Sequence, residues 1–260
     1  METYIDLGNA ASSRQDILMD YDEYLQKVGF RFYGPLSRLK GFRRLTNLAA
    51  RFNIPFEIVN TRLPDGTRDM KRKLGPLCDI PRMSTFAIGA IINRSVSCMA
   101  QDTCFVNVGV WNGFTLLSGM VGNRDKLCIG VDNFSEFGGP REQFLRRFNE
   151  HKSPKHLFYD IDYREYFTKV HSGEIGFYIY DGEHSYENQV TGLKLAEPFF
   201  ARTCVVLVDD TNGIGPRQAK QATLDFINQS RNKYEILLDA QTRGNGHPTF
   251  WNGLMIFRKC

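Results

Sequence analysis

The ten residues from Cys104 to Gly113, which read CFVNVGVWNG, constrain the fold of this chain more than any other stretch. The first half is apolar and rich in β-branched residues, which predicts a buried parallel strand, and a helical pattern begins directly after the stretch. A strand, a tight glycine turn and a helix bring backbone N–H groups and a helix N-terminus up to a ligand. Gly109 would allow the sharp turn, and Gly113 would allow a close approach of the backbone to that ligand. An ordinary turn between strand and helix is the alternative interpretation.

Strand and helix patterns alternate along the chain after this stretch. Further strands are expected at 126–133, 155–161, 175–181, 203–210, 234–240 and 251–258. Helices are expected between them, at 137–151, 163–171, 186–200 and 214–230. Only a loop joins the last two strands, so these should pair antiparallel. The sequence therefore predicts an α/β fold, a doubly wound seven-stranded Rossmann-like sheet with a C-terminal antiparallel hairpin.

The first 100 residues have a different pattern. We treat residues 1–100 as a mainly helical N-terminal segment, which would shape a substrate pocket or contact a second copy of the chain, and residues 101–260 as the ligand-binding domain. Helices are expected at 13–28, 36–52 and 84–99, and a loop at 54–75, which holds prolines and many charges. Two basic clusters, at 38–44 and 68–73, suit either an anionic partner or a solvated surface.

Composition argues against several classes of protein. No apolar run approaches the roughly 18 residues that span a bilayer, and the N-terminus lacks the basic and apolar regions of a signal peptide. The six cysteines show no Cys-x-x-Cys pairing, which indicates a reducing compartment without disulfides. A net charge of +4 is too small to indicate nucleic acid. We therefore expect a cytoplasmic protein that binds neither membrane nor nucleic acid, and a homo-oligomer is left open.

Polar residues follow the first three strands of the expected sheet, where an open α/β sheet binds its ligand. The first strand offers Asn107 and the glycine turn, and the second ends in Asp132 and Asn133. Asp132 lies 23 residues beyond Gly109, close to the spacing of about 20 at which an acid accepts both ribose hydroxyls of an adenosine. Capping a helix is the alternative role for Asp132. Asp160 and Asp162 follow the third strand, and either suits an adenine amino group or the cap of the next helix.

Carboxylates gather at the ends of the fourth and fifth strands. Asp181 ends one strand, while Asp209 and Asp210 end the other. If these strands are neighbours, the carboxylates repel one another unless a cation neutralises them, and three oxygen donors favour Mg²⁺. The alternative is that Asp209 and Asp210 cap a helix and Asp181 faces solvent. His184 follows closely and can remove a proton from a substrate hydroxyl, or it is a structural histidine.

These residues resemble those of class I S-adenosylmethionine-dependent methyltransferases. More narrowly, they are similar to the metal-dependent small-molecule O-methyltransferases that act on sugar hydroxyls of macrolide and aminocoumarin antibiotics. The similarity covers roughly residues 104–259. VNVGVWNG resembles the first motif of the family, and GVDNF resembles its ribose-binding strand end. The most specific part is the run DGEHSYE from Asp181, followed by the pair Asp209 and Asp210.

The resemblance implies a cofactor, a metal and a reaction. S-adenosylmethionine would be bound by Asn107, Gly109, Val110, Trp111, Asn112, Gly113, Asp132, Asn133 and Asp162. Mg²⁺ would be held by Asp181, Asp209 and Asp210, with His184 or Asp181 as the base. The methyl acceptor would be a hydroxyl of a sugar-like or natural-product small molecule. Two positions depart from the family pattern, because Asn107 stands where an acid is usual and Trp111 where many relatives have glycine.

Two other functions are compatible with parts of the sequence. An NAD-dependent oxidoreductase would have a related sheet, but the turn lacks the third glycine of the dinucleotide fingerprint, and the terminal hairpin is wrong for that class. A cofactor-binding module without catalysis, acting through the basic N-terminal segment, is compatible with Asn107 in the first motif.

Overall fold

A computed structural model describes residues 21–38, 56–64, 67–212 and 218–260. Its main feature is a seven-stranded sheet in the order β5-β4-β3-β6-β7-β9-β8. The strands are β3 (Cys104–Val108), β4 (Leu127–Val131), β5 (His156–Tyr159), β6 (Ile175–Tyr180), β7 (Phe200–Asp209), β8 (Tyr234–Ala240) and β9 (Leu254–Lys259). The first five are parallel, and β9 runs antiparallel to both β7 and β8. The predicted doubly wound sheet and its C-terminal hairpin are confirmed.

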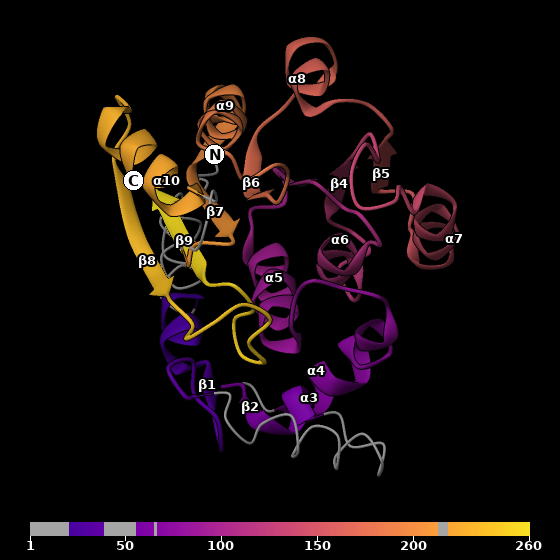
Figure 1. The fold of residues 1–260 in the computed structure, drawn as a ribbon. Helices are drawn as coiled ribbons and strands as arrows, with labels where there is room; N and C mark the ends of the chain where they lie inside the picture. Colours follow the sequence, from indigo (N-terminus) through magenta and orange to yellow (C-terminus); the bar gives the residue numbers. More distant parts are fainter. Residues whose placement is uncertain (1–20, 39–55, 65–66, 213–217) are drawn as a thin grey trace, which may run out of the picture.

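Helices cover both faces of the sheet (Figure 1). One layer holds α5 (Phe86–Cys98), α6 (Phe114–Met120) and α7 (Arg141–His151). The other holds α8 (Tyr163–Glu165) with the π-helical turn η2 (Tyr166–Val170), α9 (Tyr186–Ala196) with the short helix η3 (Glu197–Phe199), and α10 (Ala219–Gln229). Two helices are shorter than the sequence predicts. The helix expected at 137–151 begins only at Arg141, because Gly138 and Gly139 before it have left-handed backbones. The helix expected at 214–230 is described from Ala219, and residues 213–217 lie outside the described residues.

The two apolar faces of the sheet follow from the alternation of side chains along each strand. Phe105 on β3 stacks on Phe177 of β6 at a ring distance of 5.0 Å, and both belong to the core under α5 and α6. Their neighbours Val106 and Tyr178 point the other way, into the core under α9 and α10. A sheet buried on both faces explains why its strands read as continuous apolar runs.

The N-terminal segment contains more regular structure than the sequence indicated. Residues 21–27 are helical and α5 is confirmed, whereas the helix expected at 36–52 lies almost wholly outside the described residues. The prediction of a loop at 54–75 was wrong. This stretch forms α3 (Phe56–Asn60), β2 (Thr61–Arg62) and α4 (Thr67–Leu74). Strand β2 pairs with β1 (Gly29–Phe30). On α4, Leu74 is buried while Arg68 and Arg72 are exposed. The charges are therefore the solvent face of an amphipathic helix.

The chain order of the strands locates a crevice. After β3 the chain builds β4 and β5 on one side and then crosses to β6 on the other side of β3. Such a reversal opens a ligand-binding crevice at the carboxyl ends of the two strands that flank it.

None of the described helices is both long and apolar enough to cross a bilayer.

Stability should fall in mild acid because the folded chain buries neutral histidine. His156 is buried, and its Nδ1 accepts a hydrogen bond from Ser153 N while its Nε2 donates one to Asn123 O. Burial lowers the pKa of His156 below its ordinary 6.5. The unfolded chain therefore takes up more protons below about pH 6.5, so the free energy of unfolding should decrease as the pH falls. Urea unfolding at pH 7.5 and 5.5 measures this, and His156→Gln should show a smaller decrease than the wild type. An equal decrease in the variant would contradict the assignment.

Candidate active site

The turn after β3 is built around Gly109. This residue has φ +78°, and a Cβ placed on it would lie 2.0 Å from the carbonyl oxygen of Asp181. Asp181 N in turn donates to Val108 O at 3.0 Å. The first residue after β6 is thus packed directly against the turn, and no residue with a side chain fits at Gly109.

Asp132, at the end of β4, holds the same turn from the other side. Its Oδ2 accepts hydrogen bonds from Val110 N at 2.8 Å and Trp111 N at 2.9 Å, and its Oδ1 accepts one from Phe134 N at 2.7 Å. A carboxylate oxygen has two lone pairs, so one acceptor position remains on Oδ1. Asp132 therefore orders the turn and keeps one acceptor for a ligand hydroxyl.

Removing this carboxylate should loosen the turn. Asp132→Ala leaves three backbone N–H groups without their acceptor and should lower the free energy of unfolding by about 2–4 kcal/mol. Asp132→Asn retains an acceptor oxygen and should cost about 1 kcal/mol. Urea unfolding of both variants tests this order, and an alanine variant as stable as the wild type would refute it.

The remaining residues of the first motif have different environments. Asn112 is buried, and its Oδ1 accepts a hydrogen bond from Arg147 of α7 at 2.9 Å. Gly113 has φ +100°, and a Cβ there would lie 3.0 Å from the ring of Phe144, so packing against α7 explains this glycine. Asn107 is fully buried and donates to Gly109 O at 3.0 Å. Neither Asn107 nor Gly113 is among the residues that line the cleft beyond the turn.

This cleft has a volume of about 250 Å³ and lies beyond the carboxyl ends of β3, β4, β6 and β7. The other residues named from the sequence all line it: Gly109, Val110, Trp111, Asn112, Asp132, Asn133, Asp162, Asp181, His184, Asp209 and Asp210. Acidic side chains outnumber basic ones in its wall, and they are Asp132, Glu136, Asp162, Asp181, Glu183, Asp209 and Asp210. Among the described lining residues, the basic ones are Arg82 and Arg164. Such a cleft favours a ligand that carries positive charge.

His184 lies between two of the acids. Its Nε2 is 3.3 Å from Asp210 Oδ2 and 3.6 Å from Asp181 Oδ1, and its side chain is only 14% exposed. Burial raises the pKa of the Asp181 carboxyl, and His184 partly offsets this rise. Asn252 Nδ2 donates to the other oxygen of Asp210 at 2.6 Å, so the carboxylate beside the imidazole is fixed on both sides. A carboxylate so placed orients the imidazole and stabilises its protonated form.

The three acids offer hard oxygen donors, which suit Mg²⁺, but their arrangement does not form a ready metal site. His184 lies between Asp181 and Asp210, and Asp209 Oδ1 accepts a hydrogen bond from Asp210 N at 2.8 Å. Across the described part of the chain, no group of three or more His, Cys, Asp or Glu side chains is arranged to hold a metal ion.

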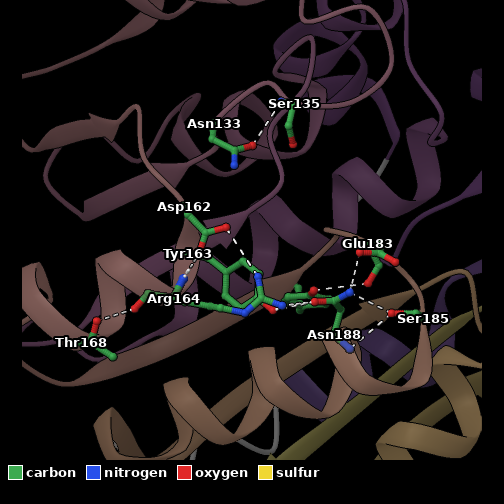
Figure 2. Close-up of polar contacts among 10 residues, drawn as sticks. Asn133, Ser135, Asp162, Tyr163, Arg164, Thr168, Glu183, Ser185 and Asn188 are labelled. Atoms are coloured by element: carbon green, nitrogen blue, oxygen red, sulfur yellow. Dashed lines mark hydrogen bonds and ion pairs between the residues drawn. The ribbon is translucent and has the colours of Figure 1, made fainter.

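A polar cluster lies where α8 meets α9 (Figure 2), and Asp162, Tyr163, Arg164, Glu183 and Asn188 of this cluster line the cleft. Asp162 caps α8 by accepting a hydrogen bond from Arg164 N at 2.8 Å. Capping the next helix was one of the two roles expected for this residue. The Arg164 guanidinium lies over the Tyr163 ring at 4.6 Å and donates to Asn188 Oδ1, and Asn188 also donates to Glu183. Asn133 is exposed and accepts a hydrogen bond from Ser135 N at 3.1 Å.

Left-handed backbone conformations concentrate at this cleft. In the described part of the chain, the non-glycine residues with positive φ all line it: Trp111, Phe134, Phe137, Asp210 and Trp251. Each such residue costs of order 1–3 kcal/mol, and strain of this kind collects at functional sites. The distribution supports the cleft as the functional site of the fold.

Comparison with known proteins agrees with this geometry. Residues 106–211 match the family model described as a methyltransferase domain. The match begins within β3 and ends just beyond Asp210, so it includes the glycine turn, Asp132 and His184 with its two acids. Residues 106–211 therefore carry a methyltransferase domain. S-adenosylmethionine is the methyl donor of such domains, and the match favours a methyltransferase over the NAD-dependent alternative.

Solved structures share the fold of this methyltransferase. A proposed O-methyltransferase from Klebsiella pneumoniae has a TM-score of 0.55 at 11% identity, over 83% of this chain and 96% of that one. A cofactor-bound protein from MTB has a TM-score of 0.54 at 11% identity, over 83% and 95%. A proposed caffeoyl-CoA O-methyltransferase from Staphylococcus aureus has a TM-score of 0.51 at 12% identity, over 84% and 98%. None of the curated protein sequences matches the chain.

Several residues of the methyltransferase cleft could not be identified from sequence motifs. They are Arg82, Ser84, Phe134, Phe137, Tyr163, Arg164, Asn188, Trp251 and Asn252. Trp251 and Asn252 belong to the loop between β8 and β9, whose glycines at 244, 246 and 253 were the available signal. Phe134 ends the GVDNF motif, but the motif did not indicate that this side chain lines the cleft. The others come from helix starts and loops outside the motifs, and only the folded chain brings them to the cleft.

Proposed function

We propose that this methyltransferase transfers a methyl group from S-adenosylmethionine to a hydroxyl of a small molecule, with His184 as the general base. The position of His184 between Asp181 and Asp210, inside the cleft, carries the proposal. When bound, S-adenosylmethionine supplies the methyl group from a sulfonium, and the acidic wall suits that positive charge. Asp132 and the Gly109 turn would hold the nucleoside end.

The residues of the cleft would act on the acceptor as follows. His184 would take the proton of the acceptor hydroxyl on Nδ1, while its Nε2–H donates to Asp210 Oδ2, which lies 3.3 Å away. The freed oxygen forms a bond to the methyl carbon, while the electron pair of the broken C–S bond goes to sulfur. Asn252 keeps Asp210 in place during this exchange. The chain thus contributes orientation, a base and electrostatic stabilisation.

Mg²⁺ dependence is a separate proposal. Asp181, Asp209 and Asp210 would hold the ion once the His184 side chain had moved from between two of them. The ion would lower the pKa of the acceptor hydroxyl. Isothermal titration with MgCl₂ tests this, since the double variant Asp181→Ala plus Asp209→Ala should lose Mg²⁺ binding but retain affinity for S-adenosylmethionine. An unchanged Mg²⁺ affinity in that variant would reject the metal role.

A transfer assay tests the proposed function itself. S-adenosylmethionine labelled in its methyl group is incubated with the enzyme and a panel of sugar-like and phenolic hydroxyl compounds, with MgCl₂ or with EDTA. Label should appear in at least one compound, and in none with His184→Ala. Binding of S-adenosylmethionine without transfer to any compound, and without slow hydrolysis, would instead favour a binding module.

A further inference from the structure

A second hollow of about 510 Å³ adjoins the methyltransferase cleft. Its wall comes from α3, from η1 (Pro76–Asp79), from the start of α5 and from the loop between β8 and β9. Pro81, Arg82, Ser84 and Trp251 line both spaces. These shared residues place the hollow directly beside the cleft that contains His184.

Two hydrogen-bond donors at this junction are unused. Ser84 is only 5% exposed, and among the described residues its Oγ has no hydrogen-bond partner. Arg82 Nε is likewise buried without one, although the two terminal nitrogens of the guanidinium donate to Glu57 and to Cys78 O. The neighbouring Thr85 is different, since its hydroxyl caps α5 and donates to Thr249 O at 2.5 Å. A buried polar atom without a partner is costly, so both donors indicate a ligand that accepts hydrogen bonds.

The charges around the hollow argue that this ligand is neutral. Glu57 already pairs with Arg82, and Asp79 is a second acid in the wall. The adjoining cleft is itself acidic, so a carboxylate or phosphate would enter against a negative field. Phe56, Pro248 and Trp251 supply apolar and aromatic surface.

We propose that this hollow is the acceptor site, and that it takes a neutral, partly apolar compound whose oxygen accepts hydrogen bonds from Ser84 Oγ and Arg82 Nε. The inference rests on the proposed function and adds to it the chemical class of the acceptor. Arg82 is suited to the task because its guanidinium lies over the Phe114 ring at 5.3 Å and is fixed by Glu57, so little side-chain entropy is lost on binding.

The chain offers a direct readout, because it contains two tryptophans, Trp111 in the cleft and Trp251 at the junction. Their indole N–H signals in a ¹H–¹⁵N spectrum can be assigned with Trp251→Phe. S-adenosylhomocysteine should shift the Trp111 signal. Benzamide, added to the protein saturated with S-adenosylhomocysteine, should then shift the Trp251 signal, and the isosteric anion benzoate should bind at least about 10-fold more weakly.

Substitution of Ser84 completes the test. Ser84→Ala removes one donor and should weaken benzamide binding about 2- to 13-fold, the effect of one hydrogen bond. The matched control is Ser97→Ala, at the exposed far end of α5, which should change nothing. Since Ser84 Oγ loses no hydrogen bond to any described residue, the melting temperature of Ser84→Ala should equal or exceed that of the wild type.

The inference is overturned if benzamide leaves Trp251 unshifted, if benzoate binds as tightly as benzamide, or if Ser84→Ala binds benzamide normally. Failure of the proposed function looks different, because S-adenosylhomocysteine would then leave Trp111 unshifted.

Discussion

Gly109→Ala should abolish cofactor binding and lower the free energy of unfolding by about 2–5 kcal/mol. The left-handed backbone at this position costs about 1–2 kcal/mol for a residue with a side chain. The new Cβ would also lie 2.0 Å from Asp181 O, and relieving this overlap adds about 1–3 kcal/mol. Because the overlap is with backbone, the end of β6 must move away from the turn. Calorimetric titration with S-adenosylhomocysteine and urea unfolding measure the two effects.

Gly173→Ala separates the two contributions. Gly173 also has a left-handed backbone, with φ +91°, but a Cβ there meets nothing within 4 Å. This variant should therefore lose only about 1–2 kcal/mol and bind S-adenosylhomocysteine normally. If both variants lost the same stability, the close approach of Asp181 to the turn would be wrong.

His184→Gln should reduce methyl transfer about 10²- to 10⁴-fold while leaving affinity for S-adenosylmethionine within a few-fold of the wild type. The range is that of a general base, and glutamine removes the base while keeping a side chain of similar length. Single-turnover transfer to the acceptor found in the panel assay measures the rate, and calorimetry measures affinity. A variant that kept its rate would show that another group takes the proton.

Asp210→Asn tests whether the carboxylate beside His184 contributes to methyl transfer. The amide retains an oxygen for Asn252 but loses the negative charge beside His184. The transfer rate should fall, and a double variant with His184→Gln should be little slower than His184→Gln alone, since the two residues act together. Fully additive losses would mean that Asp210 and His184 act separately.

The main features of the fold could be predicted because strands buried on both faces have a simple sequence pattern. Phe105 and Val106 point to opposite cores, so β3 is apolar at every position except the buried Asn107. The topology places the ends of β6 and β7 side by side, which is why the order of strands along the chain was enough to group Asp181 with Asp210. The contact of Asp181 and Asp210 with His184 depends on where the side chains lie, which the spacing of residues in the sequence does not specify.

Other parts could not be predicted from local patterns. The charges of α4 suited a loop as well as a helix, and only the burial of Leu74 distinguishes the two. Asp132 was expected to bind ribose, and its hydrogen bonds to Val110 N and Trp111 N depend on how two strand ends meet. Ser84 and Trp251 are far apart in the sequence and become neighbours of one hollow only in the folded chain.

A crystal structure with S-adenosylhomocysteine would locate the cofactor in the cleft. We expect the ribose beside Asp132, the thioether sulfur beside the turn at Gly109, and the hollow at Ser84 open for the acceptor. The compound bound elsewhere, with the Gly109 turn empty and the acids of β6 and β7 splayed apart, would contradict this expectation.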